Sequence, residues 1–355
     1  MRRIHLWIGL SSGLVVFIVS ITGACYAFEK EIREVIHRDV YKVENFAGEK
    51  LPLDSIIQSV QAQNKKQKIK QVILQTDDRT IQVNLKNKTS LFIHPVTGKV
   101  VGIINQETEV LAVLLKIHRQ LYLGEVGKKI TGVSCLIFLI SLITGLVLWF
   151  PNKLKQLSQR LKIATDKGKK RLNFDLHRSM GFYAAFVLIF SALSGLVFSF
   201  KWAEKILYVA SSSVKSEKKY FSDTLVIGQK SGLEPILENL RRMHPSKTIL
   251  LVLPEDNKGA IRATVQLGSM GLFTANSHYF FDQYTGKELG HLLYEEQSTG
   301  EKLRASNYNF HTGKTLGLFG EILVFLASVI AASLPITGFI IWRNKTKKKS
   351  KALAN

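Results

Sequence analysis

The chain has 355 residues, a length at which more than one folding unit is expected. Hydrophobic residues make up 46% of it, and they gather in four long runs, which excludes an ordinary soluble globular protein. The formal net charge of +22 would suit a nucleic-acid partner, but the positions of the basic residues argue against one.

Each apolar run is long enough to cross a bilayer, which takes about 20 residues. We predict membrane-spanning helices within residues 1–28, 128–151, 177–200 and 314–342. Arg2 and Arg3 precede the first span, and basic residues fill the loop 152–176 and the tail 343–355. These three clusters share one side if the spans alternate, and the positive-inside rule makes that side cytoplasmic. We therefore expect a multi-pass inner-membrane protein with both termini in the cytoplasm, whose lysines face water or lipid headgroups rather than nucleic acid.

The first span has an alternative interpretation as a signal peptide. Arg2 and Arg3 would supply its basic region, and Thr22-Gly23-Ala24-Cys25 suggests a lipoprotein cleavage site. We prefer a retained span, because the apolar run is longer than that of a usual signal peptide. Cys25 and Cys135 both lie inside predicted spans, so no disulfide framework is indicated. The chain contains no C-x-x-C-H motif, which excludes covalent haem attachment at such a motif.

The chain is an internal duplication. The stretch from His118 to Trp149 recurs without a gap as the stretch from His311 to Trp342. The matched positions are Gly124 with Gly317, Gly127 with Gly320, Thr144-Gly145 with Thr337-Gly338, and Trp149 with Trp342. The first and third spans match as well: His5 and His177 are each followed by a glycine four residues later, and the spans close with Thr22-Gly23 and Ser194-Gly195.

Each half also carries an extracytoplasmic domain, at residues 29–127 and 201–313. Apolar spacing predicts a helix at 51–63 in the first domain and at 232–243 in the second. Alternating runs then predict strands at 71–75, 80–85, 90–94 and 99–104, and at 248–253, 260–267, 277–282 and 287–294. The last two strands of each domain flank a similar turn, Val96-Thr97-Gly98-Lys99 or Tyr284-Thr285-Gly286-Lys287. We expect a membrane α+β fold, with four transmembrane helices and two helix-plus-antiparallel-meander domains.

A helix followed by a meander with a Thr-Gly-Lys turn resembles the PepSY domain. Four histidine-led spans around two such domains resemble the PepSY-associated transmembrane family, over almost the whole chain. That family includes iron-regulated inner-membrane proteins and ferric-siderophore reductases. The resemblance implies haem ligands among the histidines that precede the spans, and a ferric siderophore as the substrate.

Four of the nine histidines stand before spans in matched contexts, namely His5, His118, His177 and His311. Alternating topology puts His5 and His177 at the cytoplasmic face, and His118 and His311 at the outer face. Two imidazoles across a macrocycle give six-coordinate haem b, which favours electron transfer, so two haems are expected. Gly9 and Gly181 share a helix face with His5 and His177 and would leave room for the porphyrin. A second interpretation of Gly9 is helix packing, because Gly9 and Gly13 form a small-residue motif.

The outer pair raises a geometric problem, because His118 precedes the apolar run at Ile130 by roughly 18 Å if the intervening chain is helical. We predict an elbow at Gly124 and Gly127 that lets an amphipathic piece lie on the surface, repeated at Gly317 and Gly320.

The predicted function is reduction of ferric-siderophore iron at the outer face, with the substrate between the two domains near His118 and His311. The cytoplasmic loop is too short for a flavin or nicotinamide domain, so quinol or a cytoplasmic reductase would donate the electrons. No catalytic residue is singled out by the sequence. Two alternatives remain: a non-enzymatic anchored PepSY module that binds or regulates a peptidase or another periplasmic protein, and a transporter, which the lack of buried charges in the spans disfavours.

Overall fold

The computed structural model describes residues 1–43, 48–75, 78–216, 218–223 and 231–353, with residues 347–353 as backbone alone. The chain forms two compact units. The first, which we call the helical unit, comprises residues 1–29, 110–207 and 306–355. The second, the sheet unit, comprises residues 30–109 and 208–305. Of the predicted basic tail 343–355, residues 354–355 lie outside the described part of the chain.

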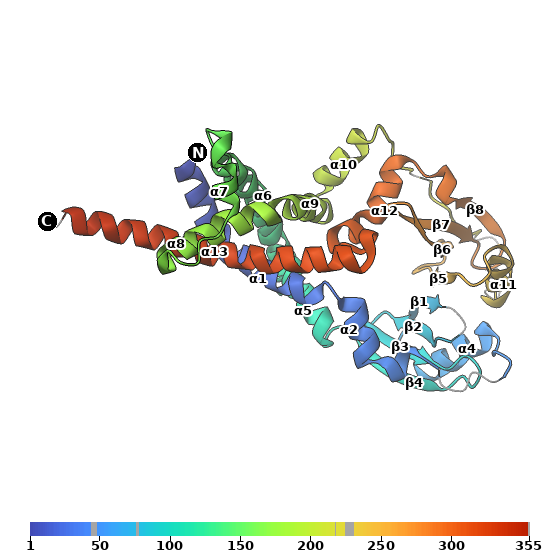
Figure 1. Cartoon of the computed structure of the whole chain (residues 1–355). Coiled ribbons are helices and arrows are strands. Elements are labelled where there is room, and N and C mark those ends of the chain that lie inside the picture. Colours follow the sequence, from blue (N-terminus) through green and yellow to red (C-terminus); the bar gives the residue numbers. More distant parts are fainter. Residues whose placement is uncertain (44–47, 76–77, 217, 224–230, 354–355) are drawn as a thin grey trace. The chain divides into compact units, whose positions relative to one another are not determined.

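The helical unit contains four helices long and apolar enough to cross a membrane (Figure 1). They are α1 (Arg2–Tyr26), α6 (Gly124–Trp149), α9 (Gly181–Ser199) and α13 (Gly317–Leu353). Helix α9 continues from α8 (Gly168–Asp175) through one π-helical turn, Leu176–Met180. All four predicted spans are confirmed, and the chain is a multi-pass membrane protein of the membrane α+β class.

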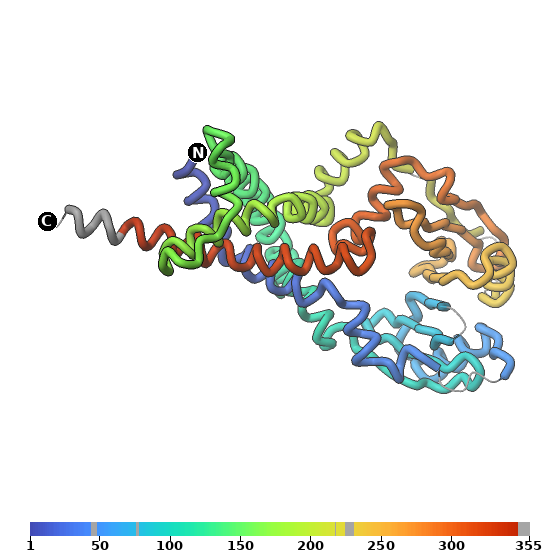
Figure 2. Tube along the Cα trace, in the orientation of Figure 1, coloured from blue at the N-terminus to red at the C-terminus, as the bar shows by residue number. Residues whose placement is uncertain are grey.

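The four spans pack as a bundle in which α1 and α9 each contact both α6 and α13. Small side chains line much of the contact, including Ala184 and Ala331, which lets the backbones approach closely. Lys345 of α13 lies within electrostatic range of Arg2, so α1 begins and α13 ends at the same end of this unit, as the trace in Figure 2 shows.

The predicted elbows are present in both halves. Helix α5 (Val110–Gln120) ends at Leu121 and Tyr122, whose φ angles are 50° and 60°, and α6 starts at Gly124. In the second half, α12 (Thr299–Thr312) ends at Gly313, with φ of 81°, and the 3₁₀ turn Lys314–Leu316 leads into α13. Left-handed backbone at these positions stops the preceding helix, so the histidine-bearing helices are separate from the spans.

The turn geometry explains the second glycine of each elbow. A Cβ atom on Gly127 would lie 1.7 Å from the carbonyl oxygen of Gln120, and one on Gly320 would lie 2.1 Å from that of Gly313. No side chain fits where the first turn of the span is pressed against the end of the preceding helix.

The sheet unit holds the two meanders, and the structure joins them. The strands are β1 (Ile69–Leu74), β2 (Ile81–Leu85), β3 (Thr89–Ile93), β4 (Val100–Asn105), β5 (Thr248–Val252), β6 (Ile261–Met270), β7 (Phe273–Phe281) and β8 (Glu288–Leu292). They form one antiparallel sheet in the order β4-β3-β2-β1-β5-β6-β7-β8. Strands β1 and β5 pair directly, with Gln71 opposite Val252 and Leu74 opposite Ile249. The two predicted domains are therefore joined where β1 and β5 pair, and a substrate between them would lie over this strand pair.

Strands β6 and β7 are longer than predicted. The predicted strands 260–267 and 277–282 leave residues 268–276 outside any strand, but β6 runs to Met270 and pairs with β7 from Phe273. A register shift between Gln266 and Gly268 accompanies the extension. Gly268 adopts φ of 105°, and a bulge of this kind lets a strand continue through a glycine that sequence patterns treat as a break.

Helices α4 (Leu53–Gln63) and α11 (Glu234–Met243) pack on one face of the sheet. Ile56, Val60, Ile236 and Leu240 enter a core with alternate residues of the strands, such as Val83 and Leu251. The two helices also cap each other. The carboxylate of Asp54 accepts hydrogen bonds from the amides of Leu233 (2.6 Å) and Glu234 (3.2 Å), and the carboxylate of Glu234 accepts one from the amide of Leu53.

Shorter elements complete the chain. They are α2 (Glu29–Ile36), α3 (Arg38–Tyr41), α7 (Leu157–Leu161), α10 (Lys201–Ala210) and the 3₁₀ turns Leu154–Gln156 and Tyr294–Glu296.

Candidate functional site

Each histidine that precedes a span contacts the Ser/Thr-Gly dipeptide that closes the other span of its own half. His5 of α1 meets Thr144-Gly145 of α6, and His118 of α5 meets Thr22-Gly23 of α1. In the second half, His177 meets Thr337-Gly338 of α13, and His311 of α12 meets Ser194-Gly195 of α9. The same contact, between a histidine and a Ser/Thr-Gly dipeptide, thus occurs four times in the helical unit.

The histidines of α1 and of the π-helical turn make matching contacts, which we call the first level. The ring nitrogen Nδ1 of His5 lies 2.9 Å from Thr144 Oγ1. The same nitrogen of His177 lies 2.9 Å from Thr337 Oγ1. Both rings also bond a backbone group one turn before the threonine, at Ser141 and Leu334. His177 sits in the π-helical turn, whereas His5 sits in regular α-helix.

The histidines of α5 and α12 make the same kind of contact, which we call the second level. Nδ1 of His118 lies 3.4 Å from Thr22 Oγ1 and 2.9 Å from the carbonyl oxygen of Val19. Nδ1 of His311 lies 2.9 Å from Ser194 Oγ and 3.0 Å from the carbonyl oxygen of Ser191. The carbonyl in each case belongs to the residue three positions before the hydroxyl, as it does at the first level.

The glycines of the four Ser/Thr-Gly dipeptides leave space for the edges of the histidine rings. A Cβ atom would lie 3.2 Å from His5 Cε1 at Gly145, 3.2 Å from His177 Cε1 at Gly338, and 3.0 Å from His118 Cε1 at Gly23. At Gly195 the corresponding distance to His311 Cε1 is 3.5 Å. A larger residue at three of these four positions would press on the imidazole.

The elbows bring His118 and His311, one from each half, together. The ring centroids of His118 and His311 lie 6.0 Å apart, with 68° between the ring planes. His5 and His177 are also near enough to interact electrostatically. The structure thus places the four histidines as two pairs, each with one member from either half. The helix rise of 1.5 Å per residue puts Thr22 roughly 25 Å along α1 from His5, so the two pairs lie at two levels of the bundle.

Burial affects how the pair of His118 and His311 titrates. Both rings are enclosed by the helical unit, and burial lowers the pKa of His118 and lowers that of His311 to about 4. Both imidazoles are therefore neutral at physiological pH, the form in which histidine binds a metal.

Gly9 and Gly181, which we predicted to leave room beside His5 and His177, differ from each other. No atom lies within 4 Å of a Cβ atom built on Gly9, whereas one on Gly181 would be in ordinary contact with Leu334 Cδ2 at 3.4 Å. Gly13, the other member of the predicted packing motif, faces Pro335 Cβ at 3.2 Å. Gly13 therefore serves helix packing, and Gly9 borders open space.

The other five histidines lie in the sheet unit and have local structural partners. The ring of His37 packs edge-on against Tyr41, with centroids 6.5 Å apart. His244 bonds the hydroxyl of Tyr279 (2.7 Å), His278 that of Thr264 (3.0 Å), and His291 pairs with Glu288 (2.7 Å). The ring of His94 accepts bonds from the amides of Val96 and Thr97 in the first Thr-Gly turn. Across the described residues, no cluster of three or more His, Cys, Asp or Glu could hold a metal ion.

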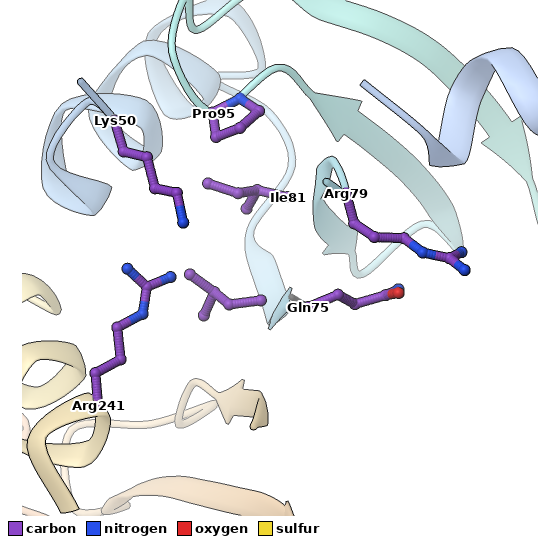
Figure 3. Close-up of a pocket in the computed structure, with 7 residues that line it drawn as sticks. Lys50, Gln75, Arg79, Ile81, Pro95 and Arg241 are labelled. Carbon is purple, nitrogen blue, oxygen red and sulfur yellow. The ribbon is translucent and has the colours of Figure 1, made fainter. Parts of the chain in front are cut away.

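The sheet unit has two hollows that bear on ligand binding. The first has a volume of about 20 Å³, room for about one water molecule, and Figure 3 shows Lys50 and Arg241 extending towards each other across it while Arg79 points away. The second is an open groove of about 390 Å³, within the usual range of ligand pockets. Its lining includes Lys218, Lys219, Arg262 and Phe280, and the Phe280 ring stacks on Tyr220 with centroids 4.4 Å apart.

The hydroxyl partners of the histidines were not identified from the sequence. Thr22, Thr144, Ser194 and Thr337 were visible only as markers of the duplication. The available signal was a hydroxyl residue followed by glycine at the far end of every span, where lipid-facing residues would otherwise be apolar.

Comparisons with known proteins agree with this architecture. The model of the family described as the PepSY-associated TM region matches residues 2–345. A search of curated proteins found no similar sequence. The match covers all four spans and both meanders, and the chain belongs to the PepSY-associated TM region family.

Proposed function

We propose that this protein is a haem b-containing electron-transfer protein of the bacterial inner membrane that reduces ferric-siderophore iron on the periplasmic side. The observation that carries the proposal is the pair of histidines at each of two levels of the bundle, each ring fixed through Nδ1. The choice of acceptor rests on the sequence resemblance to ferric-siderophore reductases described above.

The donor set favours haem over a bare metal ion. A bare ion needs about three or more protein ligands, and the described residues offer no such cluster. A haem would bring four nitrogen ligands of its own, so one or two histidines of the chain would be enough to hold it. Two metal–nitrogen bonds of about 2 Å each, plus the distance from each ring nitrogen to its ring centre, span a separation like the 6.0 Å between His118 and His311.

In this proposal His5 and His177 would hold one haem, and His118 and His311 would hold the other. A haem would supply one-electron transfer, and two histidines on each haem would favour that over binding of small ligands. The chain's own contribution is to keep the rings neutral, fixed in orientation and enclosed by apolar helices. Gly9 supplies open space beside the first pair. Quinol or a cytoplasmic reductase would supply the electron, and Fe(III) in the chelate would be reduced to Fe(II).

Absorption spectra of the purified full-length protein test the haem directly. After expression with a haem precursor, we expect a Soret band, dithionite-reduced α-bands, and two haems per chain. His118→Ala and His311→Ala should each remove one haem signal, and His5→Ala and His177→Ala the other. His291→Ala, which alters a ring in the sheet unit, should retain both. A colourless wild-type protein that tolerates loss of all four histidines would contradict the proposal and favour the partner-binding alternative.

The groove of the sheet unit supplies a site for an anionic chelate. Its lysines and Arg262 offer positive charge, and the stacked ring of Phe280 offers an aromatic surface. We predict that Arg262→Gln raises the KM for an anionic ferric siderophore severalfold without changing haem content. The measurement is Fe(II) capture by a chromogenic chelator, with the protein in liposomes and a reductant as the donor. Equal KM values for Arg262→Gln and the wild type would remove the groove from the proposal.

A further inference from the structure

The Ser/Thr hydroxyls beside the four histidines have their own protons committed elsewhere. Thr22 Oγ1 donates to the carbonyl oxygen of Ile18 at 2.7 Å, and Thr144 Oγ1 donates to that of Ser141 at 3.0 Å. Ser194 Oγ donates to the carbonyl of Phe190 at 2.9 Å, and Thr337 Oγ1 donates to that of Ser333 at 2.9 Å. A hydroxyl has one proton, so each oxygen is left as an acceptor towards the histidine it touches.

The second group at each Nδ1 is also an acceptor. The carbonyl oxygens of Val19 and Ser191 lie 2.9 Å and 3.0 Å from Nδ1 of His118 and His311. His5 and His177 make the equivalent backbone bonds to Ser141 and Leu334. A carbonyl oxygen cannot donate, so Nδ1 has to carry the proton in all four rings.

We infer that Thr22, Thr144, Ser194 and Thr337 are positioning residues that, with the carbonyl one turn earlier, hold the four histidines as the Nδ1–H tautomer and so direct Nε2 to haem iron. This inference rests on the proposed haem function. The tautomer follows from counting protons, because two acceptors converge on Nδ1 and a neutral imidazole has only one N–H. The glycine after Thr22, Thr144 or Thr337 lets the ring edge lie close enough to the helix for both bonds to form.

The arrangement also affects the electronic character of the ligand. A histidine that donates its distal N–H to an oxygen is a more basic metal ligand, and a more basic ligand stabilises the ferric state. Hydrogen bonds of this kind are one of the means by which a protein sets the reduction potential of a haem. Removal of the hydroxyl takes away one of two acceptors, so the haem should become easier to reduce.

The tautomer can be measured without haem. In full-length protein made under haem limitation, labelled with ¹⁵N-histidine and placed in lipid bilayers, nitrogen spectra distinguish Nδ1–H from Nε2–H. His177 is assigned by the loss of its signals in His177→Gln. We expect the proton on Nδ1 of His177, and a changed Nδ1 shift in Thr337→Val. A proton on Nε2 would overturn the inference, whether or not the protein binds haem.

The role in positioning is tested by redox titration of the haem-loaded protein. Thr337→Val should raise the midpoint potential of the haem held by His5 and His177 and leave the other haem unchanged, and Thr337→Ser should restore the wild-type value. Loss of that haem in Thr337→Val with retention in Thr337→Ser would support the same role. Thr346→Val is the matched control, because Thr346 lies on the same helix and its hydroxyl bonds the carbonyls of Trp342 and Arg343.

Unchanged potentials in Thr337→Val, with normal haem content, would overturn the positioning role and leave the haem proposal standing. Absence of haem from the wild type would overturn the haem proposal, and the nitrogen spectra would still decide the tautomer.

Discussion

Gly23 and Gly195 hold matching places in the two halves but leave different room for the ring beside them. A methyl group on Gly23 would lie 3.0 Å from Cε1 and 3.2 Å from Nδ1 of His118, which forces the ring to move. A methyl group on Gly195 would lie 3.5 Å from Cε1 of His311, an ordinary contact. We predict that Gly23→Ala lowers occupancy of the outer haem, whereas Gly195→Ala retains it. The haem-to-protein ratio of the two variants, purified side by side, measures this, and equal retention in both would contradict it.

Asp282 is a buried carboxylate whose bonds hold the second Thr-Gly turn. Burial would raise the pKa of Asp282, but bonds to the carboxylate outweigh burial and the pKa is lowered. The donors are the amides of Asp223, Tyr284 and Thr285, and the hydroxyl of Thr285. In the first half His94 takes the same position and accepts with its ring nitrogen.

A lowered carboxyl pKa fixes the sign of the pH dependence. The stabilisation by Asp282 is present above the unfolded-state pKa of about 3.9 and is lost as pH falls through the lower folded-state value. We predict that Asp282→Asn destabilises the sheet unit by about 1–3 kcal/mol at neutral pH, because the new side-chain NH₂ would then face a backbone N–H that needs an acceptor. Thermal unfolding of the full chain in detergent, followed by the β-sheet circular dichroism signal, measures the loss. The difference from the wild type should shrink in acid, and Glu238→Gln, on an exposed position of α11, should match the wild type throughout.

At the scale of elements, the elbows were predictable because one continuous helix would carry His118 away from the membrane, so the helix has to break between His118 and the span. The distance from His118 to the apolar run required this break, and the glycines marked its place. The span limits were predictable for a similar reason, since membrane thickness fixes helix length. The β6–β7 extension was not, because a bulge depends on pairing with the neighbouring strand rather than on local sequence. The histidine–hydroxyl contacts were not either, since they depend on which spans pack together.

The elbow predicts a strong effect from one methyl group. Gly127→Ala places Cβ against the carbonyl of Gln120, so the end of α5 has to separate from the start of α6. His118 would then move away from His311, and we expect loss of the outer haem with the inner haem retained. The check is the two-haem difference spectrum, with Val126→Ala as the control because Val126 is 65% exposed. Retention of both haems in Gly127→Ala would show that the turn can adjust.

At the scale of the whole molecule, the sequence predicted two meanders but not the sheet they share. Local turn signals fix which strands form hairpins, but they do not show which free edges meet. Pairing of β1 with β5 satisfies both inner edges and joins the two meanders in one sheet. The family and the four-span architecture were predictable because apolar length and the repeated motifs are local features.

Membrane orientation can be tested with reporters. We predict that alkaline phosphatase inserted at the β6–β7 hairpin tip, where Leu272 is 57% exposed, is active, because this reporter folds only outside the cytoplasm. The same reporter fused after Asn355 should be inactive, while a fluorescent protein fused there should be bright. The reversed pattern would place the termini outside.

The reciprocal contacts between matched elements have a consequence for the origin of the chain. Within each half, the histidine before each span contacts the hydroxyl residue at the end of the other span. Each of the two histidine pairs then takes one ring from either half. Helices α4 and α11 exchange caps in the same manner. An ancestor of half the length, assembled as a two-fold symmetric homodimer, would contain every one of these contacts. The two halves of this chain differ at equivalent positions, as with His94 in one turn and Asp282 in the other.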